Sequence, residues 1–299
     1  MPAPLDMDVL LAAAETGLAA QNAPTRENFT RHAQALSSLT LPEEWNRVTD
    51  EAIDRLQRTP QGQAAIADLK KCWDAPAGQQ GGMHPDFERS AQAYTGALTA
   101  SMNEVLAQQG AAITLSPPDV KFYGGSKFHD DGDTMPGRGG YERSLGLVYQ
   151  RKDDGNLKQP PYAITWLTHE TMHHIQYQTV DALTEGRLKD APAFLTEAAA
   201  IFNWRNAGGH DVGTPPPSPP EAEEARRATY LLLPTEADAM RAGDKSLDLL
   251  GRAFPPEMYT SFKNNPEIKT FVDGILQGDS QDKPAVISRQ AAAANNANP

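Results

Sequence analysis

The sequence contains a single cysteine, Cys72, which excludes an internal disulfide framework and a cysteine-based metal site. No stretch approaches the ~18 uninterrupted apolar residues that a membrane-spanning helix needs. Residues 1–20 also lack the basic start and the unbroken apolar run of a secretory signal. We therefore expect no membrane span and a cytoplasmic location by default. Export by a route that uses no cleavable signal stays open as an alternative.

Positive charge is scarce as well. The chain has 27 Lys and Arg residues against 39 Asp and Glu residues, which gives a net charge of -12. Such a field repels phosphate backbones and anionic lipid head groups, so we expect no nucleic-acid partner. The apolar share of 39% and the charged share of 22% are ordinary for a globular protein. A chain of 299 residues can form one large domain or two small ones.

Helical patterns dominate the first part of the chain, which is rich in Ala, Leu, Gln and Glu. The helices expected there lie near residues 5–20, 26–38, 42–58, 61–73 and 85–109. The stretch 74–82 is rich in Gly and Gln and reads as a surface linker. We place a domain boundary at its end, so that residues 1–82 form a helical N-terminal lobe.

The hydrophobic period changes to two after residue 110, and Gly-rich turns separate the apolar runs. Short strands are expected near residues 112–115, 120–123 and 145–149. After Pro160 and Pro161, which suit the first turn of a helix, an apolar helical run extends from 162 to about 180. Further helices are expected near 190–206, 221–233 and 235–250, and residues 279–299 read as a disordered tail. The predicted fold class is α+β and predominantly helical, with a small sheet packed on the 162–180 helix.

The run His169-Glu170-Thr171-Met172-His173 contains the pattern H-E-x-x-H on this expected helix. Residues four apart lie one turn above each other, so the imidazoles of His169 and His173 can converge on one zinc ion. Glu170 is rotated away from that line and can reach a water molecule on the metal, from which it takes a proton. Ile164, Trp166 and Leu167 beside the motif indicate a largely buried helix rather than a solvated one.

A catalytic zinc site commonly takes three protein ligands, and two carboxylates compete for the third position. Glu236 falls in the first turn of a helix that Pro234 opens. Glu197 lies on the next helix after the H-E-x-x-H motif. The carboxylate that does not bind the metal would be a capping or supporting group.

The motif His169-Glu170-x-x-His173-His174-Ile175-Gln176 is followed by Phe202-Asn203 and by Tyr230, Pro234, Glu236, Asp238 and Ala239. Together these residues resemble the gluzincin-like bacterial metallopeptidase domains of pattern HExxHxxQ…Y…PxExDA. The resemblance covers roughly residues 140–251, a little over a third of the chain. It implies a zincin-like metallopeptidase domain over residues 83–278, with zinc held by His169, His173 and Glu236.

The resemblance leaves some roles open. Glu197 follows His173 by 24 residues, a spacing similar to that of peptidyl-dipeptidase-type gluzincins, and it is the rival third ligand. Tyr230 and His210 are candidates for stabilising the developing oxyanion. In such folds the strand before the active helix, here near residues 145–149, lies at the sheet edge, where an extended peptide could pair with it.

We therefore predict a zinc metallopeptidase that hydrolyses amide bonds in a peptide or protein substrate, with Glu170 as the general base. One alternative is a non-catalytic binding or regulatory protein on a metallopeptidase-like scaffold. Another is a bacterial effector or toxin protease. The sequence determines neither the substrate nor the oligomeric state.

Overall fold

The computed structural model describes residues 7–74, 86–123, 139–151, 157, 159–203 and 219–278. Five helices come first: α1 (Met7–Asn22), α2 (Arg26–Ser37), α3 (Glu43–Leu56), α4 (Pro60–Asp74) and α5 (Phe87–Gln108). The strands are β1 (Asp119–Tyr123), β2 (Gly139–Glu142) and β3 (Leu147–Arg151). The later helices are α6 (Pro160–Thr184), α7 (Ala193–Asn203), α8 (Glu223–Leu232), α9 (Pro234–Ser246) and α10 (Pro266–Leu276). The described part of the chain is predominantly helical with one small sheet, as predicted. Among its helices, none is both long and apolar enough to cross a membrane.

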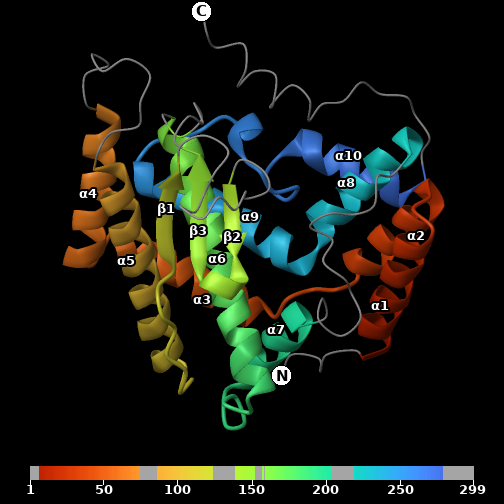
Figure 1. Cartoon of the computed structure of the whole chain (residues 1–299), viewed down its shortest axis with the longest axis horizontal. Coiled ribbons are helices and arrows are strands. Elements are labelled where there is room, and N and C mark those ends of the chain that lie inside the picture. Colours follow the sequence, from red (N-terminus) through yellow and green to blue (C-terminus); the bar gives the residue numbers. More distant parts are fainter. Residues whose placement is uncertain are drawn as a thin grey trace, which may run out of the picture.

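The sheet has the strand order β1-β3-β2, with β1 parallel and β2 antiparallel to β3. It lies against α6, and α5 flanks β1 (Figure 1). Phe122 of β1 packs between Phe87 of α5 and Trp166 of α6, which fixes the sheet to both helices. Between β2 and β3 the chain turns at Gly146, whose φ of 60° is a left-handed conformation that glycine adopts without strain.

Two strand predictions are wrong in detail. The segment 112–115 pairs with no strand in the described residues, although Ile113 and Leu115 are buried and Ala112 and Thr114 are exposed. Its backbone bonds to a side chain instead, because the amide of Asn103 donates to the Leu115 carbonyl and accepts from its N–H. The alternation therefore identified extended backbone but could not identify its partner.

The strand predicted near residues 145–149 begins at Leu147 and is the central strand, not an edge. The reason is β2, an antiparallel neighbour that the sequence pattern did not reveal. The expectation that the strand before the active helix lies at the sheet edge is therefore wrong. Helix α10 was also not predicted, and the predicted tail 279–299 lies outside the described residues.

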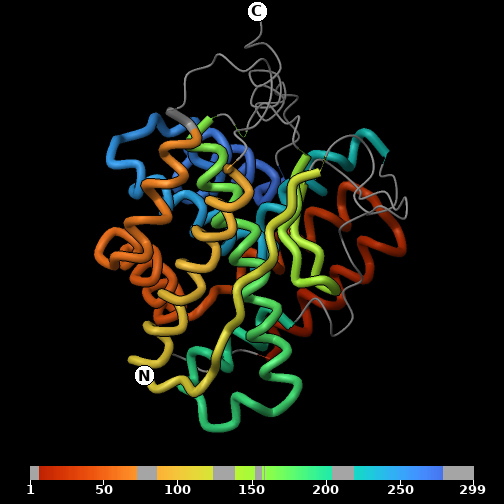
Figure 2. Tube along the Cα trace, turned by 60° about the vertical axis from the view of Figure 1, so that its left-hand side comes forward, coloured from red at the N-terminus to blue at the C-terminus, as the bar shows by residue number. Residues whose placement is uncertain are grey.

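Apolar side chains from both ends of the chain share buried clusters. One cluster joins residues of α3, such as Trp45, to Leu167 of α6 and Ala239 of α9. A second joins Leu10 and Leu36 of the first two helices to Val272 of α10. Figure 2 shows the first two helices in red, and α2 of this pair lies beside α8, in cyan. Helices within residues 7–74 therefore share buried clusters with helices that come after residue 82. The division of the chain at residue 82 stays a prediction.

Helix α9 packs very closely on α6. A Cβ atom on Gly243 would lie 3.0 Å from the carbonyl oxygen of Thr165. The hydroxyl oxygen of Ser246 lies 3.4 Å from the carbonyl oxygen of Ile164. Small residues allow the two backbones to approach, as helix pairs with short axial distances require. This approach determines how far the first turn of α9 lies from the motif on α6.

We expect Gly243→Ala and Gly96→Ala to have opposite effects on stability. Gly96 lies inside α5 with nothing within 4 Å of an added Cβ, so alanine there should raise the free energy of unfolding by about 0.5–1 kcal/mol. Alanine at position 243 must push α9 away from α6 and should lower it by about 1–3 kcal/mol. Urea unfolding of the two variants measures the difference, and equal stabilities would contradict this account of the helix pair.

His32 is a buried titratable side chain at the contact between α1 and α2. It is 3% exposed, and its Nδ1 atom lies 3.2 Å from the hydroxyl of Thr16. Burial lowers its pKa to about 4. In the unfolded chain the group has its ordinary pKa near 6.5, so between pH 6.5 and pH 4 the unfolded state binds more protons than the folded state.

The folded protein should accordingly lose stability as the pH falls through this window. For a shift of this size, linkage gives a loss on the order of 3 kcal/mol between pH 7 and pH 4. The His32→Leu variant lacks this imidazole, so its free energy of unfolding should change less over the same pH range. Urea titrations of both proteins from pH 7 to pH 4 measure the slopes. Parallel profiles would show that His32 does not contribute.

Candidate functional site

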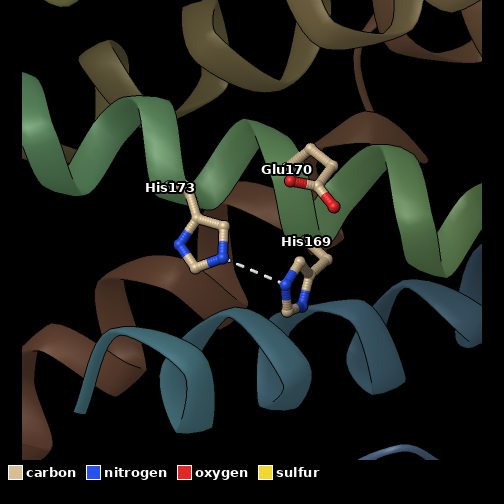
Figure 3. Close-up of side chains that lie close together, drawn as sticks. All are labelled: His169, Glu170 and His173. Carbon is tan, nitrogen blue, oxygen red and sulfur yellow. Dashed lines mark hydrogen bonds between the residues drawn. The ribbon is translucent and has the colours of Figure 1, made fainter. Parts of the chain in front are cut away.

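The two histidines of the H-E-x-x-H motif meet on one side of α6. Their Nε2 atoms are 3.0 Å apart, and their rings lie edge to face at 4.6 Å (Figure 3). Two nitrogen lone pairs would repel at this distance, so either one nitrogen carries a proton or both face a cation. His173 is buried, while His169 is partly exposed and gives the site contact with solvent. The helical spacing predicted for these residues is confirmed.

Glu236 approaches the histidines from α9. One of its carboxylate oxygens lies 3.4 Å from Nε2 of His169, and the other lies 3.5 Å from Nε2 of His173. Pro234 occupies the first turn of α9, as the sequence indicated, and Glu236 follows in the same turn. The close packing of α9 on α6 thus delivers a carboxylate to the histidine pair.

Glu170 lies within the same cluster. A carboxylate oxygen of Glu170 and one ring nitrogen each of His169 and His173 all lie within 4.8 Å of one another. The side chain is only 8% exposed, and burial raises the pKa of its carboxyl group, against the lowering effect of the two histidines. A hydrogen bond with Trp166 also favours the charged form. Glu170 is therefore a more basic carboxylate than an exposed one.

His173 and Glu236 shift each other's pKa. Burial lowers the pKa of His173, but the Glu236 carboxylate outweighs it and raises the pKa to about 9. Burial likewise raises the pKa of Glu236, yet the charges of His173 and His169 and their hydrogen bonds hold it well below its ordinary value. The pair is thus arranged to hold a positive charge at the point where its nitrogen and oxygen atoms meet.

The rival carboxylate and the oxyanion candidates have different positions. Glu197 lies on α7 and forms no ion pair with His169 or His173 in the described part of the chain. The hydroxyl of Tyr230, at the end of α8, donates to Glu236 Oε2 at 2.6 Å. His210 lies outside the described residues. Which group stabilises an oxyanion stays a prediction.

Gln176 contacts the second ring nitrogen of His173, a contact that the sequence motif did not predict. Nδ1 of His173 lies 3.1 Å from Oε1 of Gln176. The spacing of three along a helix places these side chains on one face, and this was the available signal. Trp45, which bonds to Asp238 beside this pair, comes from α3, and nothing in the local sequence could connect it to the site.

The side chains that meet here are of the types that bind zinc. Nitrogen and oxygen ligands about 2.0–2.2 Å from zinc lie about 3.3–3.6 Å from each other in tetrahedral geometry. The two Nε2 atoms are 3.0 Å apart, and each of them has a different Glu236 oxygen nearby, at 3.4 Å for His169 and 3.5 Å for His173, so the separations are of this size and the carboxylate straddles the two nitrogens. Two neutral imidazoles and one carboxylate are also a ligand set that zinc accepts.

The choice between the two carboxylates can be tested with matched variants. Glu236→Gln removes the charge next to the histidines and should lower the affinity for zinc at least 10-fold. Glu197→Gln makes the same change on α7 and should leave zinc binding unchanged. Elemental analysis after equilibrium dialysis at a series of free zinc concentrations measures the affinity. An unchanged affinity in Glu236→Gln, or a weakened one in Glu197→Gln, would contradict the assignment of the third ligand.

Comparisons with known proteins assign no family to this arrangement. No family model matches the chain, and no curated protein or solved structure shows significant similarity to it. The interpretation of the site therefore rests on its own residues and distances.

Proposed function

We propose that this chain is a zinc-dependent hydrolase that cleaves amide bonds, with His169, His173 and Glu236 as the metal ligands. The single observation that carries the proposal is the meeting of two Nε2 atoms from α6, 3.0 Å apart, with a buried carboxylate from α9 that places one oxygen within 3.5 Å of each nitrogen. Glu170, the one acid inside the H-E-x-x-H motif, belongs to the same cluster. That the fold is zincin-like is also part of this proposal.

A bound zinc ion would polarise a carbonyl group and lower the pKa of a water molecule towards ~7. Glu170 then accepts a proton from the attacking water and can return it to the leaving amine. The buried position of Glu170 suits this role because it raises the basicity of the carboxylate. Tyr230 holds Glu236 in place through its hydroxyl group.

A peptide or protein is the proposed substrate, on the strength of the resemblance in the motif. The sheet offers a place for an extended chain, because β2 has β3 as its one neighbour among the described strands. A free strand edge can pair with a peptide through main-chain hydrogen bonds. The edge at β2 replaces the one that the sequence had suggested near residues 145–149.

The general-base role of Glu170 separates an enzyme from a zinc-binding scaffold. Glu170→Gln keeps the volume of the side chain but cannot accept the proton, so it should lower kcat at least ~100-fold while zinc stays bound. Cleavage of a quenched fluorescent peptide library of mixed sequence by the zinc-loaded protein measures turnover, and a chelator should abolish it.

Glu185→Gln is the matched control, because Glu185 lies at the exposed end of the same helix and pairs with Arg187. It should cleave the library at the wild-type rate. Equal rates for Glu170→Gln and the wild type would refute the proposed mechanism. Zinc binding with no cleavage by the wild type would favour a non-catalytic protein.

A further inference from the structure

Gln176 connects the histidine pair to a second layer of buried polar groups. It is 1% exposed and lies one turn after His173 on α6. Its Oε1 atom faces Nδ1 of His173 at 3.1 Å. Its Nε2 atom faces Oδ2 of Asp238 at 2.9 Å and the carbonyl oxygen of Thr235 at 3.0 Å. Both hydrogens of this amide and one lone pair of its oxygen are therefore used inside the protein.

The orientation of the amide follows from its partners. A backbone carbonyl accepts hydrogen bonds and cannot donate them, so the group that faces Thr235 must be the NH₂ of Gln176. The oxygen of the amide then faces His173, and an amide oxygen can only accept. Nδ1 of His173 must therefore carry a hydrogen. In the neutral ring, the lone pair is left on Nε2, which points to His169 and Glu236.

Asp238 fixes the far end of this chain of hydrogen bonds. Its Oδ2 atom also accepts from the indole N–H of Trp45 at 3.0 Å, and an indole nitrogen can only donate. The guanidinium of Arg241 lies 3.3 Å from the other oxygen of Asp238. Asp238 is 2% exposed and therefore acts as a buried acceptor held from three sides. It cannot release the Gln176 amide without leaving buried donors unpaired, which is costly.

From these contacts we propose that Gln176 is a positioning residue for the metal site. Held by Asp238, it keeps the hydrogen of His173 on Nδ1 and directs Nε2 to the point shared with His169 and Glu236. The inference rests on the proposed function, because it assigns Gln176 a role towards the same metal ion. Asp238 also lies two residues after Glu236 on α9, so one turn of that helix supplies a ligand and orients the opposing one.

The hydrogen bond can be tested in the metal-free protein by NMR of ¹⁵N-labelled histidine. A bonded Nδ1–H of His173 should give a downfield, slowly exchanging proton resonance coupled to Nδ1, whether the ring is neutral or charged. Gln176→Met, which keeps the length of the side chain without its polar atoms, should remove this resonance. Gln178→Met is the matched control, because Gln178 lies on the same helix and bonds to Ser116 instead. It should leave the resonance in place.

The role in metal binding has a second readout, the dissociation constant for zinc in competition with a chromogenic chelator. Gln176→Met should bind zinc 10–100-fold more weakly than the wild type. Gln178→Met should bind within about twofold of it, since the hydrogen bonds it loses lie outside the site. Equal affinities for Gln176→Met and the wild type would overturn the proposal.

Failure of this inference is distinguishable from failure of the proposed function. A wild-type protein that binds no zinc refutes the proposed function, and the Nδ1–H resonance then decides the orientation of His173 by itself. Absence of that resonance from the wild-type spectrum, or its persistence in Gln176→Met, overturns the inference even if zinc binds. The wild-type spectrum gives this result without any variant, so the test does not depend on the folding of Gln176→Met.

Discussion

The close packing of α9 against α6 is the constraint on which the candidate site depends. Gly243 leaves no side chain between the two backbones, and the carbonyl oxygen of Thr165 lies only 3.0 Å from where its Cβ atom would be. Because a helix is stiff, this contact near the C-terminal end of α9 also determines the position of its first turn. Glu236 lies in that turn, within 3.5 Å of both histidine nitrogens. A carboxylate on a more distant helix could not reach them.

Burial then determines the chemistry of the groups brought together. Glu170, His173 and Glu236 are each less than a tenth exposed, so little solvent screens the charges among them. The acid and the base shift each other's pKa in opposite directions, which concentrates negative charge on the carboxylate and positive charge between the nitrogens. A proton satisfies this arrangement in the free protein. The proposed metal ion would use the same atoms in place of the proton.

A ring of polar contacts from distant segments supports this centre. Trp45 of α3 and Arg241 of α9 hold Asp238, and Asp50 of α3 pairs with Arg241. These groups connect the N-terminal helices to the site through hydrogen bonds as well as through apolar packing. The first helices of the chain are therefore part of the structure that surrounds the motif. Their contribution resembles that of the supporting groups that orient ligands in metal sites generally.

The sequence by itself determined the helical character of the chain, the helix that carries His169, Glu170 and His173, and the helix start at Pro234. These features depend on local periodicity and on backbone restrictions that neighbouring residues impose. Local patterns also indicated a strand at residues 112–115, but they could not distinguish a partner strand from the side chain of Asn103.

Only the tertiary structure decided which carboxylate faces the histidines, which strand lies in the middle of the sheet, and how Gln176 and Trp45 join the site. Each of these depends on contacts between segments far apart in the chain, such as the 193 residues that separate Trp45 from Asp238. Local spacing carries no information about such distances, because they result from how complete elements pack. The sequence therefore specified the chemical groups, and the packing of α9, α3 and β2 around α6 specified their arrangement.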